Sequence, residues 1–258
     1  MTALIVILIG LTIAVAALVV APRLAPRRVV FDDTPDTPKP FGYGMSWLAI
    51  KSADTDAIAR VLGLTEFERA NWNTGIGAIY DRHLSDSYVF VTPPVRGWTF
   101  VAGVPLPHPI GRTFIDKLTP LLARASAEFG EVQYFAAFPI IDYFAWTRLS
   151  KGRMIRAFAI GDDGVIWDRG RLTAEERTLG LKLFDLRGIK GRSGDAGGAI
   201  ILYPTQEQVV QLARVWSLDP TALDARGGSS KGGEQAAPGL IARVPPTWRA
   251  ERVRRQAA

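Results

Sequence analysis

The feature that most constrains this chain is an apolar run near its start, ALIVILIGLTIAVAALVVA at residues 3–21. The run has no charged residue and no proline, and with Thr2 it defines residues 2–21 as one apolar segment. A helix of this length would be roughly 30 Å long, which matches the hydrocarbon core of a bilayer. The sequence therefore predicts an N-terminal single transmembrane helix followed by a body that folds in water.

The charges beside this run indicate its processing and its orientation. A cleaved signal peptide has Lys or Arg before a shorter apolar stretch, whereas here Arg23, Arg27 and Arg28 follow the run. Because positive flanks stay in the cytoplasm, the pattern favours an uncleaved signal anchor in the cell membrane with a cytoplasmic body. The opposite orientation is the alternative.

Small residues recur along one face of the expected helix, at Gly10, Ala14, Ala17 and Ala21. Such residues let membrane helices approach closely. We therefore expect a homodimer that packs through this face. Chance is the alternative, because Gly and Ala are common in membrane helices.

The net charge of +6 is unevenly distributed. Residues 226–258 carry seven basic and two acidic residues, while the middle of the chain is close to neutral. Nucleic-acid binders cluster Lys and Arg on a folded face, so we expect no nucleic-acid partner. A lipid bilayer suits basic flanks better, at about 1 kcal/mol for each basic residue near the lipid. The expected contacts are Arg23, Arg27, Arg28, Arg249, Arg252, Arg254 and Arg255. A solvated, disordered tail is the alternative.

Composition divides the chain into four parts. Residues 22–43 follow the anchor as a basic flank and a stalk rich in Pro and Asp, which disfavour regular structure. Residues 44–224 form the expected globular domain, long enough for one sizeable core. Residues 225–258 read as a Gly-rich linker and a basic, disordered tail.

Hydrophobic patterning predicts an α+β fold for the domain. Strands are expected at 45–52, 88–92 and 97–103, the last two as a hairpin. Four more strands follow each other with short links, which makes them antiparallel neighbours. Helices are expected at 54–63 and 113–129, and after capping boxes that begin at Thr173 and Thr205. In the helix expected at 113–129, Pro120 either kinks the helix or marks its true start, with Thr119 as the cap. The result is a mainly antiparallel sheet covered on one side by helices.

The aromatic stretch EVQYFAAFPIIDYFAW at residues 131–146 raises the question of a ligand groove. One face of its second strand is apolar and the other is mixed, and the interpretation we favour is that the aromatics belong to the core. Asp142 would then lie in mid-strand, where burial would be costly without a partner. We expect an ion pair with Arg148 or Arg156, and a general base is the alternative.

The catalytic residue types are scarce. Cysteine is absent and there are two histidines, so no zinc-type ligand set is present and we expect no metal. The chain lacks the glycine-rich signatures of nucleotide sites, and we expect no cofactor. The candidate binding surface is the loop VPLPHPIGR at residues 104–112, stiffened by proline and thought to lie beside Trp98. His108 and Arg112 would give it polar groups for an anionic or peptide partner, and a simple connector is the alternative.

These features favour a membrane-tethered, non-enzymatic protein-interaction domain whose partner is another protein or a second copy. An enzyme of unfamiliar motif is the first alternative, with its pocket on the mixed sheet face near Asp142, His108 or Arg112. An extracytoplasmic envelope binding module is the second, if the topology is reversed.

Overall fold

The computed structural model describes residues 30–111, 113–162, 164–180, 203–223 and 238–253. The expected membrane helix and its packing face lie outside these residues. Within them, no helix combines the length and the apolar character that crossing a bilayer needs. The folded unit begins at Phe31.

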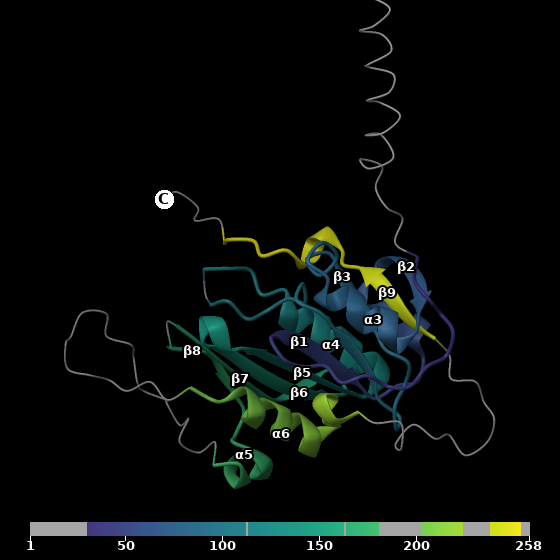
Figure 1. The fold of residues 1–258 in the computed structure, drawn as a ribbon. Coiled ribbons are helices and arrows are strands. Elements are labelled where there is room, and N and C mark those ends of the chain that lie inside the picture. The colour runs from purple at the N-terminus through teal and green to yellow at the C-terminus, as the bar shows by residue number, and fades with distance from the viewer. Residues whose placement is uncertain (1–29, 112, 163, 181–202, 224–237, 254–258) are drawn as a thin grey trace, which may run out of the picture. The chain divides into compact units, whose positions relative to one another are not determined.

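The unit is built on one sheet of nine antiparallel strands in the order β2-β9-β3-β4-β1-β5-β6-β7-β8 (Figure 1). The expected hairpin is confirmed as β3–β4, and the expected run of four antiparallel strands is confirmed as β5 to β8. The strands are β1 (Met45–Ile50), β2 (Thr65–Ala70), β3 (Tyr88–Val91), β4 (Thr99–Ala102), β5 (Glu131–Phe138), β6 (Tyr143–Ser150), β7 (Arg153–Gly161), β8 (Gly164–Arg169) and β9 (Gly239–Arg243).

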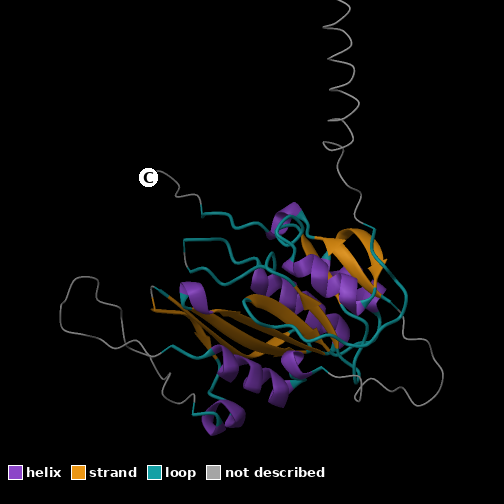
Figure 2. Cartoon of the chain, viewed as in Figure 1, coloured by secondary structure: helices purple, strands orange, loops and turns teal. Residues whose placement is uncertain are grey.

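Helices cover both faces of this sheet, so the expectation of a single covered face was wrong (Figure 2). One core cluster lies beneath α2 (Thr55–Leu62) and α4 (Leu118–Phe129), and the other beneath α3 (Trp72–Tyr80) and α6 (Gln206–Trp216). All six residues of β1 are buried, and burial along the whole length is typical of a strand covered on both faces.

Local capping signals set the ends of several helices. Asp54 caps α2, and Gly63 ends it in the left-handed conformation. The capping boxes at Thr173 and Thr205 are present before α5 (Ala174–Thr178) and α6. The remaining elements are α4, which begins at Leu118 rather than 113, and the short 3₁₀ turns η1 (Pro139–Ile141), η3 (Pro220–Ala222) and η5 (Pro246–Trp248).

The proline-rich segment 31–43, expected to be a spacer, packs against the domain. The Asp36 carboxylate accepts hydrogen bonds from the backbone N–H groups of Trp72 and Asn73 at the start of α3. Phe41 is buried at 3% exposure and makes edge contacts with Trp47 and Phe100. The prolines therefore stiffen an extended arm that belongs to the folded unit.

The C-terminal region also differs from the expectation of a wholly disordered tail. Strand β9 lies inside the sheet, hydrogen-bonded to β2 on one side and to β3 on the other. Leu240 and Ala242 enter one core cluster, while Ile241 enters the other. The domain therefore extends beyond residue 224, because a strand from the tail completes its sheet.

The aromatic stretch is confirmed as core. Tyr134 and Phe135 are fully buried, and Phe144 and Trp146 lie beneath α6. Trp146 stacks on Phe158 with ring centres 4.7 Å apart. The mixed face of the expected second strand is therefore filled by protein, and it does not form a ligand groove.

Candidate functional site

The loop 104–111, here called the proline loop, follows the C-terminal end of β4. Its start is fixed by a reciprocal contact: Gly103 N–H donates to the Ser46 carbonyl, and the Ser46 hydroxyl donates to the Gly103 carbonyl. Gly103 has φ +155°, and a Cβ there would come within 3.1 Å of the Tyr88 carbonyl oxygen. A glycine is therefore needed where the loop leaves the sheet.

Two tyrosines of the sheet hold the middle of the proline loop. His108 Nδ1 lies 2.6 Å from the Tyr134 hydroxyl oxygen, on β5. The Tyr143 hydroxyl, on β6, donates to the Pro109 carbonyl at 3.2 Å. The imidazole also packs edge-on against Phe138, with ring centres 5.4 Å apart. The loop is thus fixed to the β5–β6 hairpin by polar and aromatic contacts.

Burial determines the ionisation of this cluster. Burial lowers the pKa of His108 to about 4, and the nearby Val104 backbone opposes this only in part. Burial also raises the pKa values of Tyr134 and Tyr143, so both stay protonated hydrogen-bond donors. The imidazole is therefore neutral near pH 7. With so low a pKa it would be a weak general base there.

The C-terminal segment 244–253 packs against residues 113–117, which follow the proline loop. Ile115 N–H donates to the Glu251 carbonyl at 2.8 Å, and Val253 N–H donates to the Thr113 carbonyl at 2.9 Å. The Lys117 ammonium pairs with the Glu251 carboxylate at 3.1 Å. The residues that follow the proline loop are therefore held in place by the end of the described chain.

Two grooves meet at the proline loop. The first, which we call the tail-side groove, has a volume of about 500 Å³ and lies between the loop and the C-terminal segment, with Trp248 and Arg249 in its wall. The second, the strand-side groove, has a volume of about 440 Å³ and lies between the loop and β8. His108, Ile110 and Ile115 line both grooves. A rigid, partly apolar ridge therefore separates two hollows of ligand-binding size.

The structure does not bring the four candidate binding residues together. Trp98 lies before β4, at the opposite end of that strand from the proline loop, and it packs in the core with Lys51 Nζ 5.9 Å from its ring centre. His108 lines both grooves, and neither groove includes Asp142. Arg112 lies outside the described residues.

Asp142 was expected in mid-strand with an arginine partner, and the structure shows otherwise. It is exposed, has φ +49°, and forms the left-handed end of η1 in the turn between β5 and β6. Arg148 pairs instead with Glu131 at 2.8 Å. An exposed carboxylate in a turn has no burial cost to offset, and Asp is a common turn residue because it tolerates this conformation.

The buried arginine has other partners, which sequence reasoning missed. Arg156 is 1% exposed and forms ion pairs with Glu176 at 2.8 Å and with Asp168. Glu176 is fully buried and also accepts a hydrogen bond from the Trp146 indole. The available signal was the capping box, since Glu176 is its third helical residue and lies where the helix begins, next to the sheet.

Two of the basic residues expected at the membrane surface are described. Arg249 is exposed and lines the tail-side groove, and the Arg252 guanidinium lies over the Phe114 ring at 5.7 Å. The other expected membrane contacts and the anchor face lie outside the described residues: Arg23, Arg27, Arg28, Arg254, Arg255, Gly10, Ala14, Ala17 and Ala21.

No cluster of three or more His, Asp or Glu side chains among the described residues could hold a metal ion. A further hollow of about 460 Å³ lies near the C-terminal end of α6, lined in part by Arg96 and Arg214, and it contains none of the candidate residues. Comparison of the chain with models of known families, with curated proteins and with solved structures finds no match.

Proposed function

We propose that this protein is a membrane-tethered, non-enzymatic interaction domain, anchored by residues 2–21, whose cytoplasmic body docks another protein at the proline loop. The observation that supports this most directly is the meeting of two grooves at Ile110 and Ile115, which remain 41% and 39% exposed. Apolar side chains on a rigid ridge between hollows are typical of a recognition surface.

The chemistry of the loop favours binding over catalysis. The Nδ1 atom of His108 is already hydrogen-bonded to Tyr134. The pKa of about 4 makes the imidazole a poor proton acceptor near pH 7. The enzyme alternative placed its pocket on the mixed sheet face near Asp142, His108 or Arg112. Asp142 lies in an exposed turn outside both grooves, and His108, which lines both, is a weak base near pH 7, so that alternative has less support.

The anchor and the orientation rest on the sequence. The apolar run 2–21 and the arginines that follow it are the support for a single span with the body inside. A reporter at the C-terminus that is active on only one side of the membrane tests this orientation. Activity on the outer side would overturn the cytoplasmic assignment and favour the envelope binding module.

Docking is tested in living cells with a photocrosslinking amino acid at position 110. The matched control carries it at Val215, an apolar residue of α6 that is 56% exposed and lines neither groove. We expect one protein adduct from position 110 that is absent from position 215 and is lost when Ile115→Arg is added. Equal labelling at both positions, or none at position 110, would refute docking at the loop.

A further inference from the structure

The two edges of the sheet differ in their accessibility to another strand. The β2 edge is irregular: its pairing with β9 shifts between Thr65 and Glu68, and Glu66 has φ +46°. Five of its six residues are exposed, and three of them are charged. Charges and bulges of this kind protect an edge from adding a further strand. β8 forms the opposite edge of the sheet (Figure 1). The strand-side groove is lined by residues of this strand.

The lining of this groove shows which part of β8 it contacts. A hollow over one face of a strand is lined by alternate residues, because side chains alternate between the faces. The strand-side groove is lined by the consecutive residues 165–169. It therefore runs along the edge of β8, where alternate backbone N–H and C=O groups of an antiparallel edge strand point outward.

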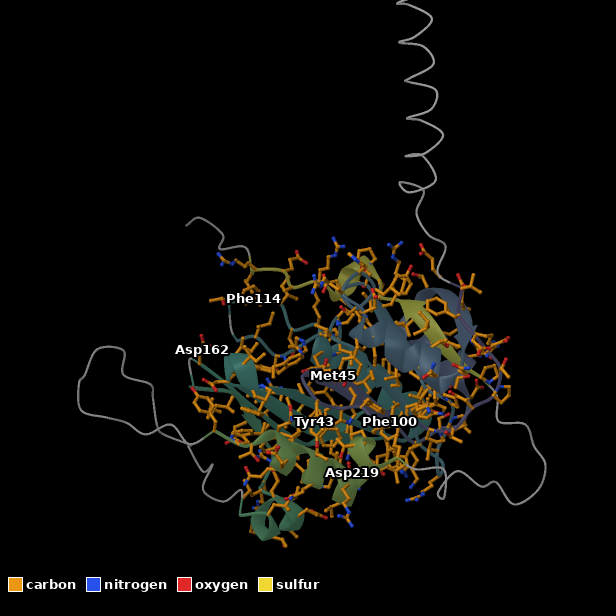
Figure 3. The ribbon with its side chains drawn as sticks, viewed as in Figure 1. Tyr43, Met45, Phe100, Phe114, Asp162 and Asp219 are labelled. Carbon is orange, nitrogen blue, oxygen red and sulfur yellow. The ribbon has the colours of Figure 1, made fainter. Side chains whose placement is uncertain are left out.

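The opposite wall of the groove is already in position. It consists of the proline loop and residues 114–116, which the sheet tyrosines and the C-terminal segment hold in place. Figure 3 labels Phe114 in this wall and Asp162 in the turn that leads into β8. A slot formed in advance lowers the entropy cost of ordering a ligand.

We infer that the β8 edge is a strand-addition site that takes an extended peptide segment of the protein partner. This inference rests on the proposed docking at the proline loop and specifies its binding mode. Backbone hydrogen bonds to β8 would supply affinity, and alternate side chains of the peptide would meet the opposite wall. The volume of about 440 Å³ accommodates a short segment rather than a folded domain.

The residues that line the groove predict which side chains this peptide carries. Ile110 and Ile115 present apolar surface toward the groove, so alternate apolar residues are expected. Asp116 is exposed and forms no ion pair with any described residue. Arg169 also lines this groove. The peptide is therefore expected to carry, among its apolar residues, a Lys or Arg placed to meet Asp116.

The test is a selection of random displayed peptides on the full-length protein in nanodiscs, followed by affinity measurements on synthetic copies. We expect alternating apolar residues with at least one Lys or Arg. Ile110→Arg is expected to weaken binding by at least about tenfold, which corresponds to about 1.4 kcal/mol, while Val215→Arg leaves it unchanged. Asp116→Asn keeps the oxygen that accepts from Thr119 N–H, and it should weaken binding mainly at low salt.

Methylation of single backbone nitrogens of the peptide then distinguishes strand addition at β8 from docking at the proline loop alone. Strand addition predicts losses of about tenfold at every second position, because only alternate N–H groups face β8. Peptides that depend on Ile110 but tolerate methylation everywhere would overturn strand addition and leave docking at the loop intact. Failure to select any peptide, or peptides insensitive to Ile110→Arg, would overturn both.

Discussion

Burial of His108 should make the stability of the domain depend on pH in a way that one substitution removes. Its folded pKa of about 4 lies below the value of about 6.5 for an unperturbed histidine. Between these values the unfolded chain binds more protons than the folded one, so acid favours unfolding. This contribution to stability is present above about pH 6.5 and is lost as the pH falls toward 4.

The magnitude follows from the two pKa values. From pH 7 to pH 5 the free energy of unfolding should fall by about 2 kcal/mol through this group alone. Further ionisable groups of the protein also respond to pH, so the observable is the difference between two proteins that differ at this one residue. His108→Gln keeps a polar side chain that can face Tyr134, and it does not titrate.

Urea unfolding of the fragment 31–258, which contains the whole folded unit, gives this difference at the two pH values. We expect the parent to lose about 2 kcal/mol more than His108→Gln. Proton NMR of the imidazole should independently place its pKa near 4. Equal losses in both proteins, with an imidazole that titrates near 6.5, would refute a half-buried His108 that stays neutral down to about pH 4.

Three further changes test the packing, each measured by urea or thermal unfolding. Gly75→Ala places a Cβ 2.3 Å from the Phe90 ring and should lower the free energy of unfolding by about 1–3 kcal/mol. The control Gly77→Ala lies in open space on the same helix and should be neutral or stabilising. The reverse order of stabilities would contradict this geometry. Glu176→Gln removes a buried, charged partner of Arg156 and should lower the free energy of unfolding by about 3 kcal/mol. The exposed control Glu128→Gln should change it by no more than about 0.5 kcal/mol. Similar values for both variants would be inconsistent with a buried ion pair. Deletion of residues 239–258 removes β9 from between β2 and β3 and should abolish cooperative unfolding; a stable, cooperative truncated domain would show that β9 is dispensable.

The proline loop shows how far sequence reasoning reached at the candidate site. Its stiffness and its polar residue His108 were visible in the sequence, and they directed attention to this loop. Its partners were not visible, because Tyr134 and Tyr143 come from strands far from the loop in the chain. Trp98 was grouped with the loop through sequence proximity, although β4 separates the two.

The sequence by itself determined the local structure. The cap at Asp54, the capping boxes at Thr173 and Thr205, and the strands β5 to β8 follow from residues within a few positions of each other. It also determined that the aromatic stretch is apolar enough to be core. These features depend on backbone geometry and hydrophobic period, which neighbouring residues specify.

Only the tertiary structure decided where these elements meet. The run GLIAR is a short apolar segment that reads as part of a tail, and it becomes β9 because β2 and β3 both offer it hydrogen bonds. Asp142 fell in a turn because the β5–β6 register pairs Phe138 with Tyr143. The grooves at the proline loop likewise depend on β8 and on the C-terminal segment. Contacts of this kind form between residues far apart in the chain, and no local pattern encodes them.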